Sequence, residues 1–140
     1  YFVYGMHHCM NVVAGETGDP VAVLIRALEP DAGLDTMFER RRRARRATDL
    51  CSGPAKLCQA LGIDLGHDGE DLTSSNVLSI ASPVRRQPPA TIVATPRIGI
   101  AYAEEWQHKP LRFFLAGNPH VSHGRRESRR RPSAIAAGRP

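Results

Sequence analysis

The sequence lacks a long apolar run, and this absence limits where the protein can act. No stretch approaches the ~20 consecutive apolar residues that a bilayer-spanning helix needs. The start also lacks the charged segment and short apolar segment of a secretory signal. We therefore expect an intracellular protein, placed in the cytoplasm or nucleoid of a bacterium or in the nucleus of a eukaryote.

Cysteine is scarce, and familiar catalytic motifs are missing. Cys9, Cys51 and Cys58 are an odd number, and Cys51 and Cys58 lack the close spacing of a zinc knuckle, so we expect reduced thiols. There is no phosphate-binding glycine loop, nucleophile elbow or metalloprotease histidine pair. His7 and His8 are adjacent and would point to opposite faces of a strand. The sequence therefore predicts no metal site.

Arginine is what the sequence has in excess. Lys and Arg number 19 against 14 Asp and Glu, which gives a net charge of +5. Such a charge favours an anionic partner, either nucleic acid or a membrane surface, and does not decide between them. A length of 140 residues with 41% hydrophobic residues indicates one globular core.

Turn residues divide the chain into short elements. A strand with a kink at Gly5 is followed by a turn at 14–20 and an apolar strand at 21–28, which together predict an antiparallel hairpin. Further signals predict a helix over 34–50 with Leu34 and Met37 on its apolar side. A second helix is predicted within 51–63, with Ser52 or Gly53 as its cap, Pro54 near its first turn, and Leu57, Ala60 and Leu61 at helical spacing. A loop over 64–90, a short strand from Thr95 and a last strand at 111–115 follow. Residues 123–140 contain too little apolar surface to order themselves and are predicted to form a basic disordered tail.

Several polar residues have two interpretations each. Six of the seven residues from 40 to 46 are Arg, which fits either a solvated helical surface or contact with phosphate. Arg26 interrupts an apolar run, so it either lies in solvent at a strand end or serves a site. Asn11 either satisfies a turn or serves a site, and Lys56 lies near a helix start that could bind phosphate.

Five separated blocks resemble one family. They are YGMHHCMN, LIRALEP, LCSGPAKLCQALGI, RIGIAYAEEW and KPLRFFLAGNPHVS, and they occur in the order and approximate spacing of the alkyladenine (3-methyladenine) DNA glycosylases, over most of Tyr1 to Ser122. The resemblance implies an α+β fold, a single mixed domain over 1–122 with a curved antiparallel sheet flanked by helices and incomplete at its N-terminus. It also implies a monofunctional base-excision enzyme that hydrolyses the bond between a damaged purine, such as 3-methyladenine or hypoxanthine, and deoxyribose.

The resemblance assigns roles residue by residue. Tyr4 matches the tyrosine that fills the gap left by the flipped nucleotide, and Lys56 matches a residue near the DNA phosphates. Tyr1 matches a tyrosine that stacks on the flipped base, and Asn11 matches an asparagine that crowds the 2-amino group of guanine. In the catalytic group, Arg26 matches the arginine that holds the water and the general base, and the backbone carbonyl of Ile98 matches one that contacts the water.

The family's general base is a glutamate that precedes the opening hairpin, and no residue of this chain matches it. On the resemblance, Tyr1 is internal to a longer enzyme, and the 140 residues alone are expected to be inactive. No cofactor or metal is implied, and the expected partner of the monomer is double-stranded DNA with damaged purines, not a membrane. The alternative is a non-catalytic module that binds lesions or bent DNA through Tyr4 and the arginine run.

Overall fold

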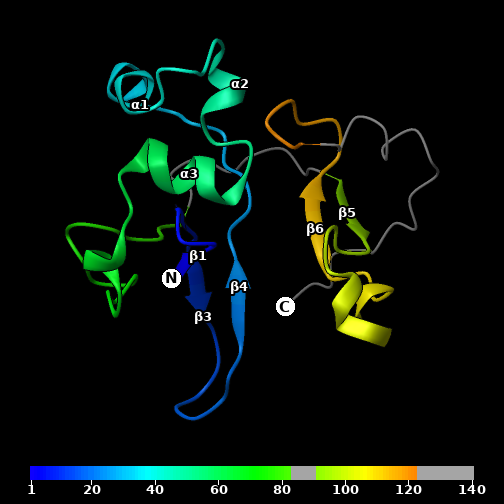
Figure 1. Cartoon of the computed structure of the whole chain (residues 1–140). Coiled ribbons are helices and arrows are strands. Elements are labelled where there is room, and N and C mark those ends of the chain that lie inside the picture. The colour runs from blue at the N-terminus through cyan, green and yellow to red at the C-terminus, as the bar shows by residue number, and fades with distance from the viewer. Residues whose placement is uncertain (83–90, 123–140) are drawn as a thin grey trace. The chain divides into compact units, whose positions relative to one another are not determined.

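The computed structural model describes residues 1–82 and 91–122 (Figure 1). The chain divides into two compact units, Tyr1–Val84 and Arg85–Pro140, and each is described by itself. The tail predicted at 123–140 lies outside the described residues. A domain boundary at Ser122 therefore stays a prediction.

Two antiparallel pairs of strands open the first unit. Strand β1 (Phe2–Val3) pairs with β2 (His7–His8), and β3 (Asn11–Val13) pairs with β4 (Ala22–Leu24). The predicted kink at Gly5 is confirmed as a tight turn, and the hairpin across the Gly- and Asp-rich turn is confirmed. Strand β4 is shorter than the predicted 21–28, because the chain leaves β3 beyond Ile25 and Leu28 N–H donates instead to the Cys51 carbonyl at 3.2 Å.

Three helices follow, α1 (Leu34–Arg40), α2 (Ala47–Leu50) and α3 (Pro54–Leu61). The prediction of one helix over 34–50 was wrong, since Arg41 departs from helical geometry and Arg46 is extended. Like charges four residues apart, such as Arg41 and Arg45, weaken a helix at this point. The start of α3 is confirmed, with Gly53 as N-cap and Pro54 at the first position.

The core of the first unit lies between these helices. Helices α1, α2 and α3 pack against one another, and α3 also packs against β2 (Figure 1). The predicted apolar positions Met37, Leu57 and Ala60 are buried, Leu61 is partly buried, and Leu34 is exposed, contrary to the prediction. The full set of buried core residues is Met37, Leu50, Cys51, Leu57, Cys58, Ala60 and Ile63. After α3, a single 3-10 turn η1 (Leu65–His67) interrupts the predicted loop.

The second unit is built on one antiparallel pair, β5 (Ile92–Thr95) and β6 (Arg112–Leu115), in which Val93 faces Phe114. Strand β6 matches the prediction, whereas β5 ends at Thr95 instead of beginning there, because Pro96 has no N–H to continue the ladder. The 3-10 segment η2 (Ala101–Gln107) connects them and contains Trp106.

The α+β class and the antiparallel pairing are confirmed. The described strands form three two-stranded sheets, whereas the expectation was one curved sheet. Among residues 1–82 and 91–122, no helix has the length and apolar character required to cross a bilayer.

Candidate functional site

The turn between β1 and β2 presents an aromatic ring to solvent. Tyr4 is 84% exposed, and its φ of 55° lies in the left-handed region that few residues other than glycine adopt. Gly5 continues the turn with φ 64°. At the other end of the hairpin, Tyr1 and Cys9 exchange two hydrogen bonds of 2.9 Å. A short, hydrogen-bonded arm therefore carries Tyr4 at its tip.

A cleft of about 580 Å³ lies in the same unit. Tyr1 and Asn11 both line it, so the structure brings together the two residues predicted for the base pocket. Its other walls come from residues 9–13, which include β3, and from the segment that follows α3. The complete lining is Tyr1, Cys9, Met10, Asn11, Val12, Val13, Ile63, Asp64, Leu65, His67, Asp68, Gly69, Glu70, Asp71, Leu72, Thr73, Leu78 and Ile80.

Acidic side chains form part of this lining, and the sequence analysis missed them. They are Asp64, Asp68, Glu70 and Asp71. The Gly66 N–H (2.9 Å) and the His67 ring (3.1 Å) bond the Asp64 carboxylate and lower its pKa. The hydroxyl (2.6 Å) and N–H (2.9 Å) of Thr73 lower the pKa of Asp71 in the same way. Both carboxylates therefore stay ionised, and the concentration of acidic residues over 64–71 was the signal available in the sequence.

The two predicted catalytic positions lie in different units, Arg26 in the first and Ile98 in the second. Arg26 lies two residues beyond the end of β4 and is exposed, and it is not among the cleft residues. Ile98 belongs to the second unit, where it is 46% exposed and precedes Gly99 with φ 76°. The roles of Arg26 and Ile98 therefore stay predictions.

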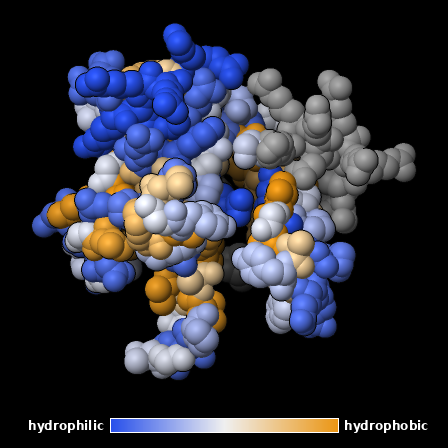
Figure 2. All heavy atoms as spheres, viewed as in Figure 1, coloured by the Kyte–Doolittle hydropathy of each residue, from blue (hydrophilic) through white to orange (hydrophobic). Residues whose placement is uncertain are grey.

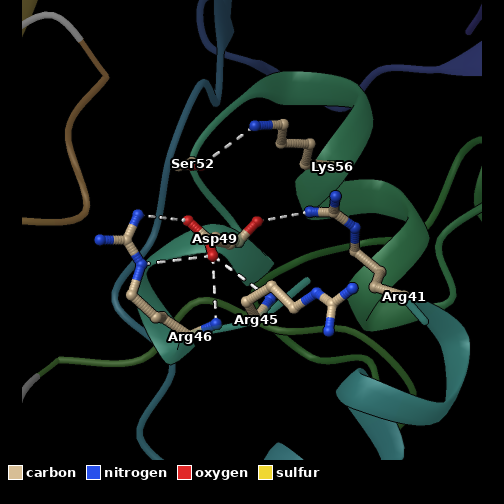
Figure 3. A network of polar contacts seen from close by, with 6 residues as sticks. All are labelled: Arg41, Arg45, Arg46, Asp49, Ser52 and Lys56. Atoms are coloured by element: carbon tan, nitrogen blue, oxygen red, sulfur yellow. Dashed lines mark hydrogen bonds and ion pairs between the residues drawn. The ribbon is translucent and has the colours of Figure 1, made fainter. Parts of the chain in front are cut away.

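Lys56 lies in the first turn of α3. Its ammonium group donates to the Ser52 hydroxyl at 3.4 Å (Figure 3), and its side chain is exposed. Among residues 1–82 and 91–122, no group of His, Cys, Asp or Glu is arranged to hold a metal ion.

Comparison with known proteins places the chain in a family. Residues 1–119 match the family described as methylpurine-DNA glycosylase (MPG). The chain therefore belongs to the methylpurine-DNA glycosylase family, and the resemblance drawn from the five sequence blocks is confirmed.

Relatives from animals and bacteria are similar over most of the chain. It is 45% identical over 131 residues to the mouse DNA-3-methyladenine glycosylase, a match that covers 87% of the chain and 39% of the mouse protein. The human DNA-3-methyladenine glycosylase is 44% identical over 131 residues, a match that covers 87% of the chain and 43% of the human protein. A relative from Carboxydothermus hydrogenoformans is 47% identical over 124 residues, a match that covers 87% of the chain and 61% of the bacterial protein. The chain thus spans about two fifths to three fifths of the length of these relatives.

Proposed function

We propose that the protein acts in base-excision repair as a DNA glycosylase. It would flip alkylated or deaminated purines, such as 3-methyladenine and hypoxanthine, out of duplex DNA and hydrolyse the N-glycosidic bond. Family membership supports this proposal. The observation that carries it is the β1–β2 arm, which has the exposed Tyr4 ring at its tip and, at its base, Tyr1 lining the cleft with Asn11.

Base flipping requires a group that fills the gap in the stack. Extruding a nucleotide costs a few kcal/mol, and the ring that replaces it offsets part of that cost. Tyr4 suits this task because its ring has no packing role to give up and its turn holds it away from the protein surface. Tyr4 would therefore enter the duplex as the damaged base leaves it.

The cleft would bind the damaged purine after it leaves the duplex. The Tyr1 ring would stack on the base, and an electron-poor alkylated purine binds an aromatic face better than a normal base does. Asn11 would crowd the 2-amino group of guanine and so exclude the commonest undamaged purine that resembles the substrate. The ionised carboxylates of Asp64 and Asp71 would further favour a base that carries a positive charge.

The chemistry is hydrolysis by a positioned water. Alkylation at N3 or N7 makes the purine cationic, so the C1′–N bond breaks readily and its electron pair goes to the departing base. Water adds to C1′ and gives its proton to the family's general-base carboxylate, which no residue of this chain matches, and free base and an abasic site remain. Arg26 would hold the water and that carboxylate, and the Ile98 carbonyl would accept a hydrogen bond from the water. This reaction needs no metal or redox cofactor.

The proposed partner is double-stranded DNA containing a damaged purine, bound by a monomer. Lys56 would contact a backbone phosphate, because its exposed ammonium group lies in the first turn of α3 next to free N–H groups.

The test is single-turnover release of 3-methyladenine from methylated duplex DNA. Because no residue of the chain matches the family's general base, the wild type and its Arg26→Gln variant are both prepared with any in-frame codons that precede Tyr1 in the gene. We expect Arg26→Gln to slow release at least 10-fold. Lys109→Gln is the control, because Lys109 is a partly exposed cation whose ammonium group lies 3.4 Å from the centre of the Trp106 ring, and it should release base normally. If the wild type binds damaged DNA tightly without releasing base, the non-catalytic module is favoured. If Arg26→Gln releases base as fast as the wild type, Arg26 does not hold the water or the carboxylate.

A further inference from the structure

The segment Arg40–Arg46 contains six arginines and connects α1 to α2. Ala44, the one residue in it that is not Arg, is partly buried and packs against the core. Ala44 therefore anchors the segment to the core of the first unit. The arginines around it differ in whether their guanidinium groups bond to the protein.

Three of the arginines bond to the protein itself. Arg40 donates to the Ala60 carbonyl at 3.2 Å, near the end of α3. Arg41 donates to the Asp49 carbonyl of α2 at 2.6 Å (Figure 3). It also donates to the Leu50 carbonyl at 2.5 Å. Such bonds satisfy the carbonyls that the end of a helix leaves free, and a cation there also complements the helix dipole.

Arg46 is the third of these arginines. Its guanidinium pairs with the Asp49 carboxylate at 3.1 Å, and its backbone N–H donates to the same carboxylate at 3.1 Å (Figure 3). This pairing lowers the pKa of Asp49 and begins α2. The Asp49 carboxylate is therefore already paired with Arg46.

The remaining three, Arg42, Arg43 and Arg45, are exposed. Within residues 1–82 and 91–122, their guanidinium groups have no hydrogen bond or ion pair. Arg45 bonds to Asp49 only through its backbone N–H at 3.3 Å, and its side chain extends away from that carboxylate (Figure 3). Hydrophilic residues gather on the face over α1 and α2 (Figure 2). We call Arg42, Arg43 and Arg45 the outer arginine patch.

We propose that the outer arginine patch binds the phosphate backbone of undamaged duplex beside the lesion. This inference rests on the proposed function, because it takes DNA as the partner. Arginine suits phosphate through its planar, permanently charged fork of donors. The bonds of Arg40, Arg41 and Arg46 hold the backbone of the segment in place, so less conformational entropy is lost when the patch binds.

The patch is separate from the proposed flipping arm. Helix α3 packs against α1 on one side and against β2 on the other, so it lies between the arginine segment and the β1–β2 arm that carries Tyr4 (Figure 1). Contacts made by the patch would therefore fall on duplex away from the flipped nucleotide. They would raise affinity for all DNA without changing which base is excised.

The test is the salt dependence of binding to an undamaged 20-base-pair duplex. Three phosphate contacts contribute about 2.7 to the slope of log K against log salt, so Arg42→Gln/Arg43→Gln/Arg45→Gln should reduce that slope by about 2–3. The matched control replaces the same three residues by Lys, which keeps the charge and should keep most of the slope. Base release at saturating protein should be the same for both variants and wild type.

Each outcome separates this inference from the proposed function. An unchanged slope in the Gln variant, with normal base release by wild type, overturns the patch alone. A reduced slope without base release by the wild type, extended by any in-frame codons that precede Tyr1, supports the patch and overturns the glycosylase proposal. If the Gln variant keeps its DNA slope and loses binding to phosphatidylserine vesicles, the patch contacts membrane and the inference is wrong. If the triple variant unfolds early, Arg43→Gln alone should still lower the slope by about 0.9.

Discussion

Replacing Tyr4 by glycine should separate the stability of the fold from base release. Because Tyr4 is 84% exposed, its removal uncovers almost no buried apolar surface. Its φ of 55° costs a residue with a Cβ about 1–2 kcal/mol, a cost that glycine avoids. Glycine in turn loses about 0.5–1 kcal/mol more conformational entropy on folding. We therefore expect Tyr4→Gly to change the free energy of unfolding by no more than about 1 kcal/mol.

Base release should fall sharply in the same variant. Losing about 1.4–2.8 kcal/mol of the compensation for unstacking slows a single-turnover step about 10- to 100-fold. The assay measures urea unfolding and single-turnover release of hypoxanthine from duplex DNA side by side, in the protein extended by any in-frame codons that precede Tyr1. Tyr102→Ala is the matched control, since Tyr102 is 83% exposed and lies outside the arm. Normal release by Tyr4→Gly, or a loss of stability above about 2 kcal/mol, would refute this reasoning.

Three further predictions concern the stability of the first unit. Leu57→Ala should lower the free energy of unfolding in urea by about 2–5 kcal/mol, because Leu57 is completely buried in the core, and a loss below 1 kcal/mol would contradict that placement. Gly62→Ala should lower the melting temperature, since Gly62 has φ 75° and a Cβ there would lie 3.0 Å from the Arg40 guanidinium; an equal or higher value would mean that neither constraint operates. Asp71→Asn should destabilise the protein at neutral pH. The folded-state pKa of Asp71 is lowered, so its contribution is present above the usual Asp value of 3.8 and is lost as the pH falls through the folded pKa. Urea titrations should show the two proteins converging below pH 3.8, and a gap that persists at pH 2 would contradict the assigned cause.

Local signals in the sequence predicted much of the first unit. The Gly, Asp and Pro residues of 14–20 identified the β3–β4 hairpin, because few other residues adopt such turns. Gly53 and Pro54 identified the start of α3, and the spacing of Leu57 and Ala60 identified its buried face. These features depend on backbone conformation and side-chain periodicity, which a single sequence displays directly.

Features that depend on tertiary contacts could not be predicted in the same way. The helix predicted over 34–50 breaks because Arg41 and Arg46 find partners in α2, and a charge run does not reveal which of its members will be paired. The acidic lining of the cleft was also missed, since residues 64–71 were taken as a polar loop and nothing local shows that they face Asn11. Tyr1 and Tyr4 were singled out only through the family resemblance, whereas Asn11 also stood out from the residues alone as a candidate with two interpretations.

The most direct test of the account is single-turnover release of hypoxanthine from a duplex oligonucleotide. It should be run on the 140-residue chain and on a form extended by any in-frame codons that precede Tyr1 in the gene, each with and without Tyr4→Gly. The account predicts release of free hypoxanthine by the form that holds the complete site, with a 10- to 100-fold slower rate in its Tyr4→Gly variant. Binding of the lesion duplex with no free base from either form would contradict the glycosylase proposal.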